Sequence, residues 1–94
     1  MKLNAQEQLV LYVVLNRNEK NEARTFPMST LPTALSAMKK LNEASSVKDG
    51  KVEFKPEAEI DFGTDEKKLL KDSLEREWDL TVAESVLSLK TKLA

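Results

Sequence analysis

Few residues in this chain have the chemical types and spacing that catalysis requires. The 94 residues include no His and no Cys, so the commonest general base, the thiolate nucleophile and most transition-metal ligands are missing. Ser36 and Lys39 have the spacing of a serine nucleophile with a lysine partner, but we expect both in the middle of a helix, with Lys39 on its polar face. We therefore predict that the protein is not an enzyme.

Acidic residues gather in the second half of the chain, where a magnesium site is the functional interpretation to weigh. Asp61, Asp65, Glu66 and Asp72 lack the spacing of a calcium-binding loop, and Asp65 and Glu66 fall in the first turn of a predicted helix. The helix dipole favours negative charge there without any metal. Only two glycines occur in the chain, so it has no glycine-rich phosphate-binding loop. We predict no metal site and no cofactor.

A group of basic residues lies in the polar segment 16–25 and in the helix that follows it. A nucleic-acid-binding regulator would place these side chains on phosphates, with helix 30–44 as the reading helix and residues 51–62 as a wing, in a winged-helix-like arrangement. Glu19 and Glu22 lie in the same polar segment, and the acidic residues of the wing would meet phosphate with the wrong sign. Nucleic-acid binding is therefore the alternative function. Its candidate contacts are Arg17, Lys20, Arg24, Lys39 and Lys40.

The segment from Lys51 to Phe62, KVEFKPEAEIDF, alternates apolar and polar residues on either side of Pro56. A period of two puts alternate side chains on one face of an extended chain. Because proline donates no hydrogen bond to a neighbouring strand, we divide the segment into strands near 51–54 and 58–62. A further extended piece is expected at residues 1–3, paired with part of 51–62.

Helical periodicity surrounds this extended segment on both sides. Apolar residues make up 40% of the chain and charged residues 33%, which is typical of a folded and highly charged domain. We expect one domain, residues 1–94, of the α+β class and mostly helical. It should have four helices, with a small two- or three-stranded β layer between the second and third helices. No internal repeat is apparent. Spacing and capping residues place the helices near 5–17, 30–44, 65–77 and 82–93.

The first predicted helix contains seven consecutive apolar residues, Leu9 to Leu15, which cover its whole circumference. A helix that is apolar on every side is expected to be buried on every side. Two interpretations follow. The helix is either the central helix of a monomer or a contact with a second copy in a homodimer, with Val10, Leu11 and Val14 as the contact residues.

Apolar side chains at helical spacing also mark the predicted core of the other three helices. Trp78 follows Leu70 and Leu74 at intervals of four residues, so we place it on the same helix face as an anchor of the core. The residues predicted to be buried are Leu35, Met38, Leu70, Leu74, Val86 and Leu89.

The apolar run Leu9–Leu15 is also the stretch to compare with targeting segments. It is much shorter than the roughly 20 residues that a membrane span needs, and no small-residue cleavage site follows it. We expect a soluble cytoplasmic protein that does not bind membranes.

Four pieces define the order of features along the chain: Met1–Asn4 (MKLN), the apolar Leu9–Leu15, Glu59–Phe62 (EIDF) and Leu80–Glu84 (LTVAE). In this order the chain resembles small uncharacterised proteins encoded in bacteriophage genomes. The resemblance implies an accessory role in the host cytoplasm and no agreed activity. Together with the missing catalytic residues, it makes a non-enzymatic protein-interaction module the leading hypothesis, with a protein partner or a second copy of the chain as the ligand.

Overall fold

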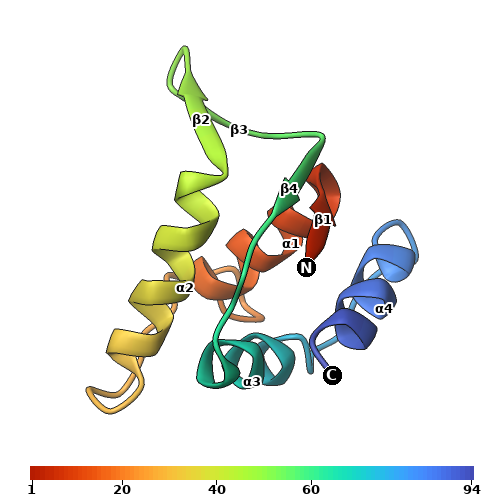
Figure 1. Cartoon of the computed structure of the whole chain (residues 1–94). Coiled ribbons are helices and arrows are strands. Elements are labelled where there is room, and N and C mark those ends of the chain that lie inside the picture. Colours follow the sequence, from red (N-terminus) through yellow and green to blue (C-terminus); the bar gives the residue numbers. More distant parts are fainter.

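The computed structural model describes the backbone of residues 1–94 and all side chains except those of Val47 and Lys48. It confirms the predicted α+β class, mostly helical, with three of the four short strands between the second and third helices (Figure 1). The elements follow in the order β1 (Lys2–Asn4), α1 (Ala5–Asn16), α2 (Leu31–Glu43), β2 (Ser45–Lys48), β3 (Lys51–Phe54), β4 (Glu57–Glu59), α3 (Thr64–Ser73) and α4 (Ala83–Lys92).

The strands form two separate two-stranded antiparallel sheets instead of one layer. β1 pairs with β4, with Leu3 opposite Ala58, which confirms the predicted pairing of the N-terminal strand with part of 51–62. β2, which the sequence analysis did not predict, pairs with β3 through a turn at Asp49 and Gly50. Both turn residues have positive φ (52° and 75°), as a tight hairpin turn requires.

α1 lies between the other helices: α2 and α4 flank it on opposite sides and α3 passes below it in Figure 1. Its Val10, Leu11 and Val14 are buried in the core of the single chain, so they have no surface with which to contact a second copy. This corrects the proposed dimer contact. The expectation that α1 is buried on every side is also wrong, because Leu9 and Val13 are exposed.

The core prediction for α2 is wrong for Leu35 and holds only in part for Met38, which packs against the core from its edge. Leu35 is 53% exposed and Met38 is only partly buried, whereas Ala34 and Ala37 are buried. Small side chains let two helices approach closely, so the alanine side of α2 packs inward and the larger Leu35 points outward. The other four core predictions are confirmed, for Leu70, Leu74, Val86 and Leu89.

α3 ends at Ser73, four residues earlier than predicted. The next three residues after Leu74 are all charged, so they offer no apolar side chain to continue the buried face of the helix. Trp78 therefore does not lie on that helix face. It still packs against the core, and its indole N–H donates to the carbonyl oxygen of Leu74 at 2.9 Å.

The order strand, helix, helix occurs twice in the fold, as β1–α1–α2 and as β4–α3–α4. Residues 1–15 align with the residues 59 positions later, as Glu7 does with Glu66, and residues 35–41 (LSAMKKL) align with residues 87–93 (LSLKTKL), 52 positions later. This alignment sets the helices in register but not the strands, because it places β1 against residues 61–63, which follow β4. In both halves the second helix packs against the first helix of the other half, α4 on α1 and α2 on α3.

Burial and hydrogen bonding follow the same correspondence. The matched pair Leu15 and Leu74 is buried to the same extent, with 4% of each residue exposed. Met1 and Ile60, also matched, exchange two main-chain hydrogen bonds of 2.9 and 3.0 Å. The two halves therefore share a pattern of packing and hydrogen bonding. Few matched positions are identical, and the connection between α1 and α2 (residues 17–30) is five residues longer than that between α3 and α4 (residues 74–82).

In the part of the chain that the structure describes, no helix combines the length and the apolar character needed to cross a membrane.

Candidate interaction surface

Two carboxylates are buried among the described side chains. Glu7 and Glu66 occupy matched positions, the third residue of α1 and of α3, and only 1% and 7% of each residue is exposed. Each accepts a hydrogen bond from a lysine on the second helix of the other half, Lys92 for Glu7 and Lys40 for Glu66.

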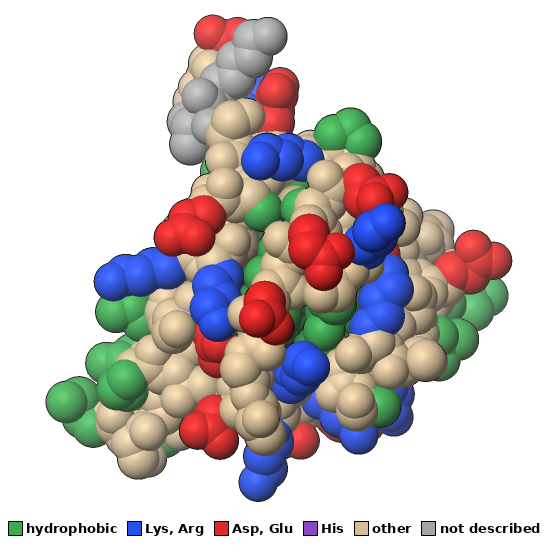
Figure 2. All heavy atoms as spheres, viewed as in Figure 1, with side chains coloured by type: hydrophobic (Ala, Val, Ile, Leu, Met, Phe, Trp, Pro, Cys, Tyr) green, Lys and Arg blue, Asp and Glu red, His purple; other side chains and the backbone are tan. Residues whose placement is uncertain are grey.

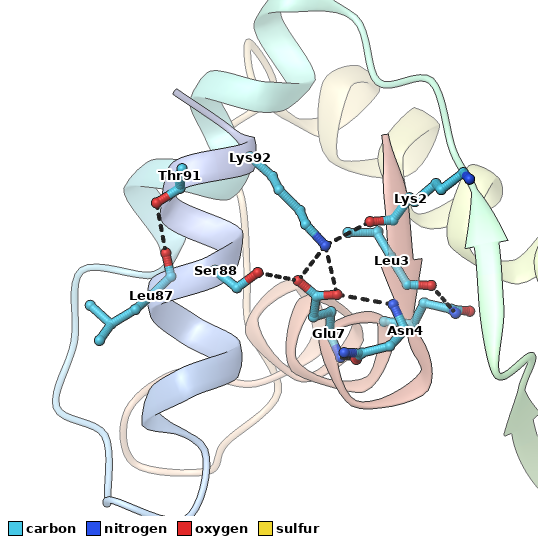
Figure 3. Close-up of polar contacts among 9 residues, drawn as sticks. Lys2, Leu3, Asn4, Glu7, Leu87, Ser88, Thr91 and Lys92 are labelled. Carbon is cyan, nitrogen blue, oxygen red and sulfur yellow. Dashed lines mark hydrogen bonds and ion pairs between the residues drawn. The ribbon is translucent and has the colours of Figure 1, made fainter.

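The Glu7 cluster comprises Glu7, Asn4, Ser88, Lys92 and Lys2 (Figure 3). The carboxylate accepts from the Asn4 amide (3.0 Å), the Ser88 hydroxyl (2.9 Å) and, through both oxygens, the Lys92 ammonium (2.9 Å each). The ammonium also donates to the carbonyl oxygen of Lys2 at 2.7 Å. Burial alone would raise the pKa of Glu7, but these hydrogen bonds together outweigh it and lower the pKa below the usual value.

The Glu66 cluster repeats this arrangement with Gly63, Ser36, Lys40 and Asp61. Oε1 of Glu66 accepts from the Gly63 amide (2.7 Å) and the Lys40 ammonium (2.6 Å), and Lys40 also donates to the carbonyl oxygen of Asp61 at 2.8 Å. Oε2 of Glu66 is buried and has no hydrogen-bond partner among the described side chains. Burial alone would raise the pKa of Glu66, but the hydrogen bonds from Lys40 and Gly63, helped by the Ser36 hydroxyl, outweigh it and lower the pKa below the usual value.

Both clusters tie helices together and leave little room for chemistry. A general acid needs a raised pKa and contact with its substrate, whereas these carboxylates are held ionised and closed off from solvent. Of the acidic residues weighed as metal ligands, Asp61, Asp65 and Asp72 are exposed and only Glu66 is buried. Among the described side chains, no three acidic residues lie close enough to hold a metal ion.

The five basic residues of the nucleic-acid alternative do not form one surface. The Arg24 guanidinium donates to the Val14 carbonyl oxygen and the Ser73 hydroxyl, both at 2.7 Å, and lies 4.5 Å from the centre of the Phe26 ring. Burial, followed by the nearby charge of Arg76, lowers the pKa of Arg24. Lys40 belongs to the Glu66 cluster. The remaining three, Arg17, Lys20 and Lys39, are exposed, and Arg17 lines a different hollow from Lys40.

Exposed apolar side chains instead gather around the N-terminal half of α2. Met28 is 81% exposed, Leu31 and Leu35 are also exposed, and Phe26 and Met38 are partly buried. We call these five residues the α2 face. Figure 2 shows hydrophobic side chains at this end of α2, at the lower left. Four of the five, all except Met28, border a hollow of about 310 Å³ whose other lining residues are Leu15, Asn16, Ala23, Arg24 and Ala34.

The matched surface on α4 is built differently. Leu87 corresponds to Leu35 and is 65% exposed, but Glu84 and Lys90, three residues before and after it, are both exposed and charged. Single exposed leucines are common on soluble proteins, whereas a group of apolar side chains around a hollow is a mark of a binding surface. The α2 face is therefore the candidate interaction surface.

No protein-family model, curated protein or solved structure matches this chain. The candidate surface therefore rests on the geometry of the described residues.

Local sequence patterns predict neither the two clusters nor the outward position of Leu35. Ser88 and Lys92 lie more than 80 residues from Glu7 in the chain, so no local pattern connects them. The signal that was available is the repeated pattern Leu-Ser-x-x-x-Lys-Leu at residues 35–41 and 87–93. In each copy the serine and the lysine are four residues apart, which places them on one side of a helix.

Proposed function

We propose that this protein is a non-enzymatic interaction module that binds another protein through the α2 face. The observation that carries the proposal is the pair of exposed leucines, Leu31 and Leu35, that borders the hollow together with Phe26, with the exposed Met28 three residues before Leu31. Covering such side chains with a partner removes them from water, which is favourable by about 25 cal/mol per Å². Flexible methionine side chains suit a surface that adapts to its partner.

The partner is either a different protein or a second copy of this chain. A second copy would use the α2 face, because Val10, Leu11 and Val14 are buried. The resemblance to small bacteriophage proteins supports an accessory role, in which the module binds a host protein in the cytoplasm.

The matched leucines supply the test. Leu35→Lys places a charge on the α2 face, and Leu87→Lys makes the same change at the corresponding exposed position of α4. Sedimentation at micromolar concentration measures self-association, and affinity capture from cells that encode the protein detects other partners. We expect Leu35→Lys to weaken association at least tenfold and Leu87→Lys to change it less than threefold.

Equal effects of the two substitutions, or association that neither changes, would contradict the proposal. Circular dichroism of both variants checks that the helices remain folded. Because both leucines are exposed, neither substitution removes a core side chain.

A further inference from the structure

The outer edge of β4 carries main-chain groups that no strand pairs with. Met1 and Ile60 form a hydrogen-bonded pair across the β1–β4 sheet. Such pairs alternate in antiparallel strands, so Leu3 and Ala58 form the next one. The N–H and C=O groups of Glu57 and Glu59 consequently point away from β1. Within the described residues, these groups make no main-chain hydrogen bond on that side.

This edge borders a groove of about 410 Å³ between β4 and the C-terminal part of α2. The volume falls within the range of roughly 300–1,000 Å³ that is usual for small ligand sites. Ala44, Ala58 and Ile60 supply its apolar lining. Figure 2 shows the hollow in the middle of the view, with hydrophobic side chains inside it and charged ones around it.

The groove has a well-defined end on the side of β3. Gln8, which is fully buried, donates from Nε2 to the carbonyl oxygen of Lys55 at 2.9 Å and so fixes the chain just before β4. Pro56 separates Lys55 from the strand. The edge of β4 is therefore a fixed feature of the fold, held by a buried side chain of α1.

The charges around the groove are predominantly acidic. Four carboxylates line it, those of Glu43, Glu57, Glu59 and Asp61, against two ammonium groups. Of the two lining ammonium groups, that of Lys40 is already bound to Glu66. Two of the carboxylates also have partners: Glu59 accepts from the N-terminal ammonium at 2.9 Å, and Glu57 lies 3.7 Å from the Lys2 ammonium. Both of these glutamate side chains are still about two-thirds exposed and so remain open to a ligand. A ligand with positive charges thus fits this groove better than a neutral or acidic one.

We infer that this groove binds an extended basic peptide segment of a partner, which adds to β4 as a further strand. The unpaired main-chain groups of Glu57 and Glu59 supply the hydrogen bonds, and their side chains select lysine or arginine at alternate positions of the peptide. The same two carboxylates repel the β4 strand of a second copy, so the edge does not pair with itself. The α2 face takes no part in this contact.

The first measurement is a titration of the ¹⁵N-labelled protein with the blocked peptide Lys-Val-Lys-Val-Lys-Val. We expect shifts of the Glu57 and Glu59 amide signals and slower hydrogen exchange of these two amides. A peptide with Glu in place of Lys should leave them unchanged. If the lysine peptide moves neither amide, the inference is wrong.

Two N-methylated peptides distinguish strand pairing from simple charge attraction. In a paired strand, alternate amides face the neighbouring strand and the others face away. Methylation of either the three lysine amides or the three valine amides should therefore abolish binding, while methylation of the other set preserves it. If both methylated peptides bind as tightly as the parent, the contact is not an added strand.

Variants of the protein locate the contact. Glu57→Lys with Glu59→Lys should lower the affinity for the lysine peptide at least tenfold. Glu19→Lys with Glu22→Lys makes the same change of net charge in an exposed loop and should change it less than threefold. Equal losses of affinity in the two double variants would overturn the inference. If Glu57→Lys with Glu59→Lys disrupts the pairing of β1 with β4, the methylated peptides still test strand addition on the unaltered protein. Leu35→Lys should bind the peptide normally, which separates this inference from the proposed function.

Discussion

The Glu7 and Glu66 clusters share one arrangement of residues but differ in how many hydrogen bonds the carboxylate accepts. In each, a buried glutamate near the start of one helix accepts from a backbone amide and from a lysine of a helix far along the chain. Both oxygens of Glu7 have donors, including the Ser88 hydroxyl. Among the described side chains, Glu66 has donors on Oε1 only, and Oε2 is buried without a partner.

The residue before each helix explains part of this difference. Asn4 caps α1 with its side chain, whose oxygen accepts from the Glu7 amide at 2.8 Å. In return, the Glu7 carboxylate accepts from the Asn4 amide, which completes a capping box. Gly63 stands at the matched position before α3 and has no side chain, so only the return half of the capping box exists there. Both clusters therefore share the contact between a lysine and a buried glutamate. Only the Glu7 cluster also has a side-chain cap, that of Asn4.

The largest expected loss of stability comes from two substitutions at equally buried positions, one in each half of the chain. Leu15 and Leu74 are matched, and each is 4% exposed. We expect Leu15→Ala and Leu74→Ala each to lower the free energy of unfolding by about 2–5 kcal/mol, through lost burial and the cavity left behind. Urea unfolding measures both. Costs that differ by more than about 2 kcal/mol would show that the two halves contribute unequally to one core.

A smaller loss of stability tests the difference in hydrogen bonding between the Glu7 and Glu66 clusters. Glu7→Gln places an NH₂ group where the carboxylate has donors on both oxygens, so at least one donor–donor contact replaces a hydrogen bond. We expect a loss of about 2–3 kcal/mol in the free energy of unfolding. Glu66→Gln can place its NH₂ group at the position of Oε2, which has no donor, and should cost about 1 kcal/mol.

The comparison of these two variants by urea unfolding at neutral pH carries its own control, because both remove one negative charge. If Glu66→Gln proves as costly as Glu7→Gln, the unpartnered oxygen of Glu66 does not distinguish the clusters.

The dependence of stability on pH sharpens the same comparison. The folded-state pKa of Glu7 lies below its usual value of 4.5, so the unfolded chain binds more protons as the pH falls. The stability that Glu7 contributes is complete above about pH 4.5 and is lost as the pH falls through the folded-state pKa. Glu7→Gln should therefore flatten the acid side of the stability curve, by at most about 1.4 kcal/mol per pH unit.

Urea unfolding at intervals between about pH 5 and pH 3 measures this slope. The pKa of Glu66 is lowered in the same direction, so Glu66→Gln should also reduce the slope. A slope that neither variant changes would mean that other carboxylates account for the acid sensitivity.

The sequence predicts the helices and strands of this fold better than it predicts which of their side chains contact one another in the folded chain. Alternation around Pro56 and the leucines at 70 and 74 are local patterns. The structure places a strand on each side of Pro56, although β4 ends at Glu59 and not at residue 62 as predicted, and it buries both leucines. The side of α2 that packs inward depends on whether alanine or leucine fits against α1, which only the assembled core decides. The partners of Glu7 come from α4, so no window of the sequence contains them.

The smallest expected effect adds the missing cap to the second copy. Gly63 has φ −70° and ψ 169°, a conformation open to any residue. An added Cβ would lie 3.2 Å from Oε1 of Glu66, a close contact that a small shift of the carboxylate relieves. Asn4 shows that the matched position accommodates Asn beside a glutamate bound in the same way.

Gly63→Asn should therefore raise the free energy of unfolding by about 0.5–1 kcal/mol, from the new cap and from the lower entropy of the unfolded chain. Gly63→Ala is the matched control, because it adds the Cβ without the capping oxygen. If Asn gains nothing over Ala, the cap is not what separates the clusters. If both variants lose stability, the Glu66 carboxylate cannot shift, and Lys40 holds it more rigidly than Lys92 holds Glu7.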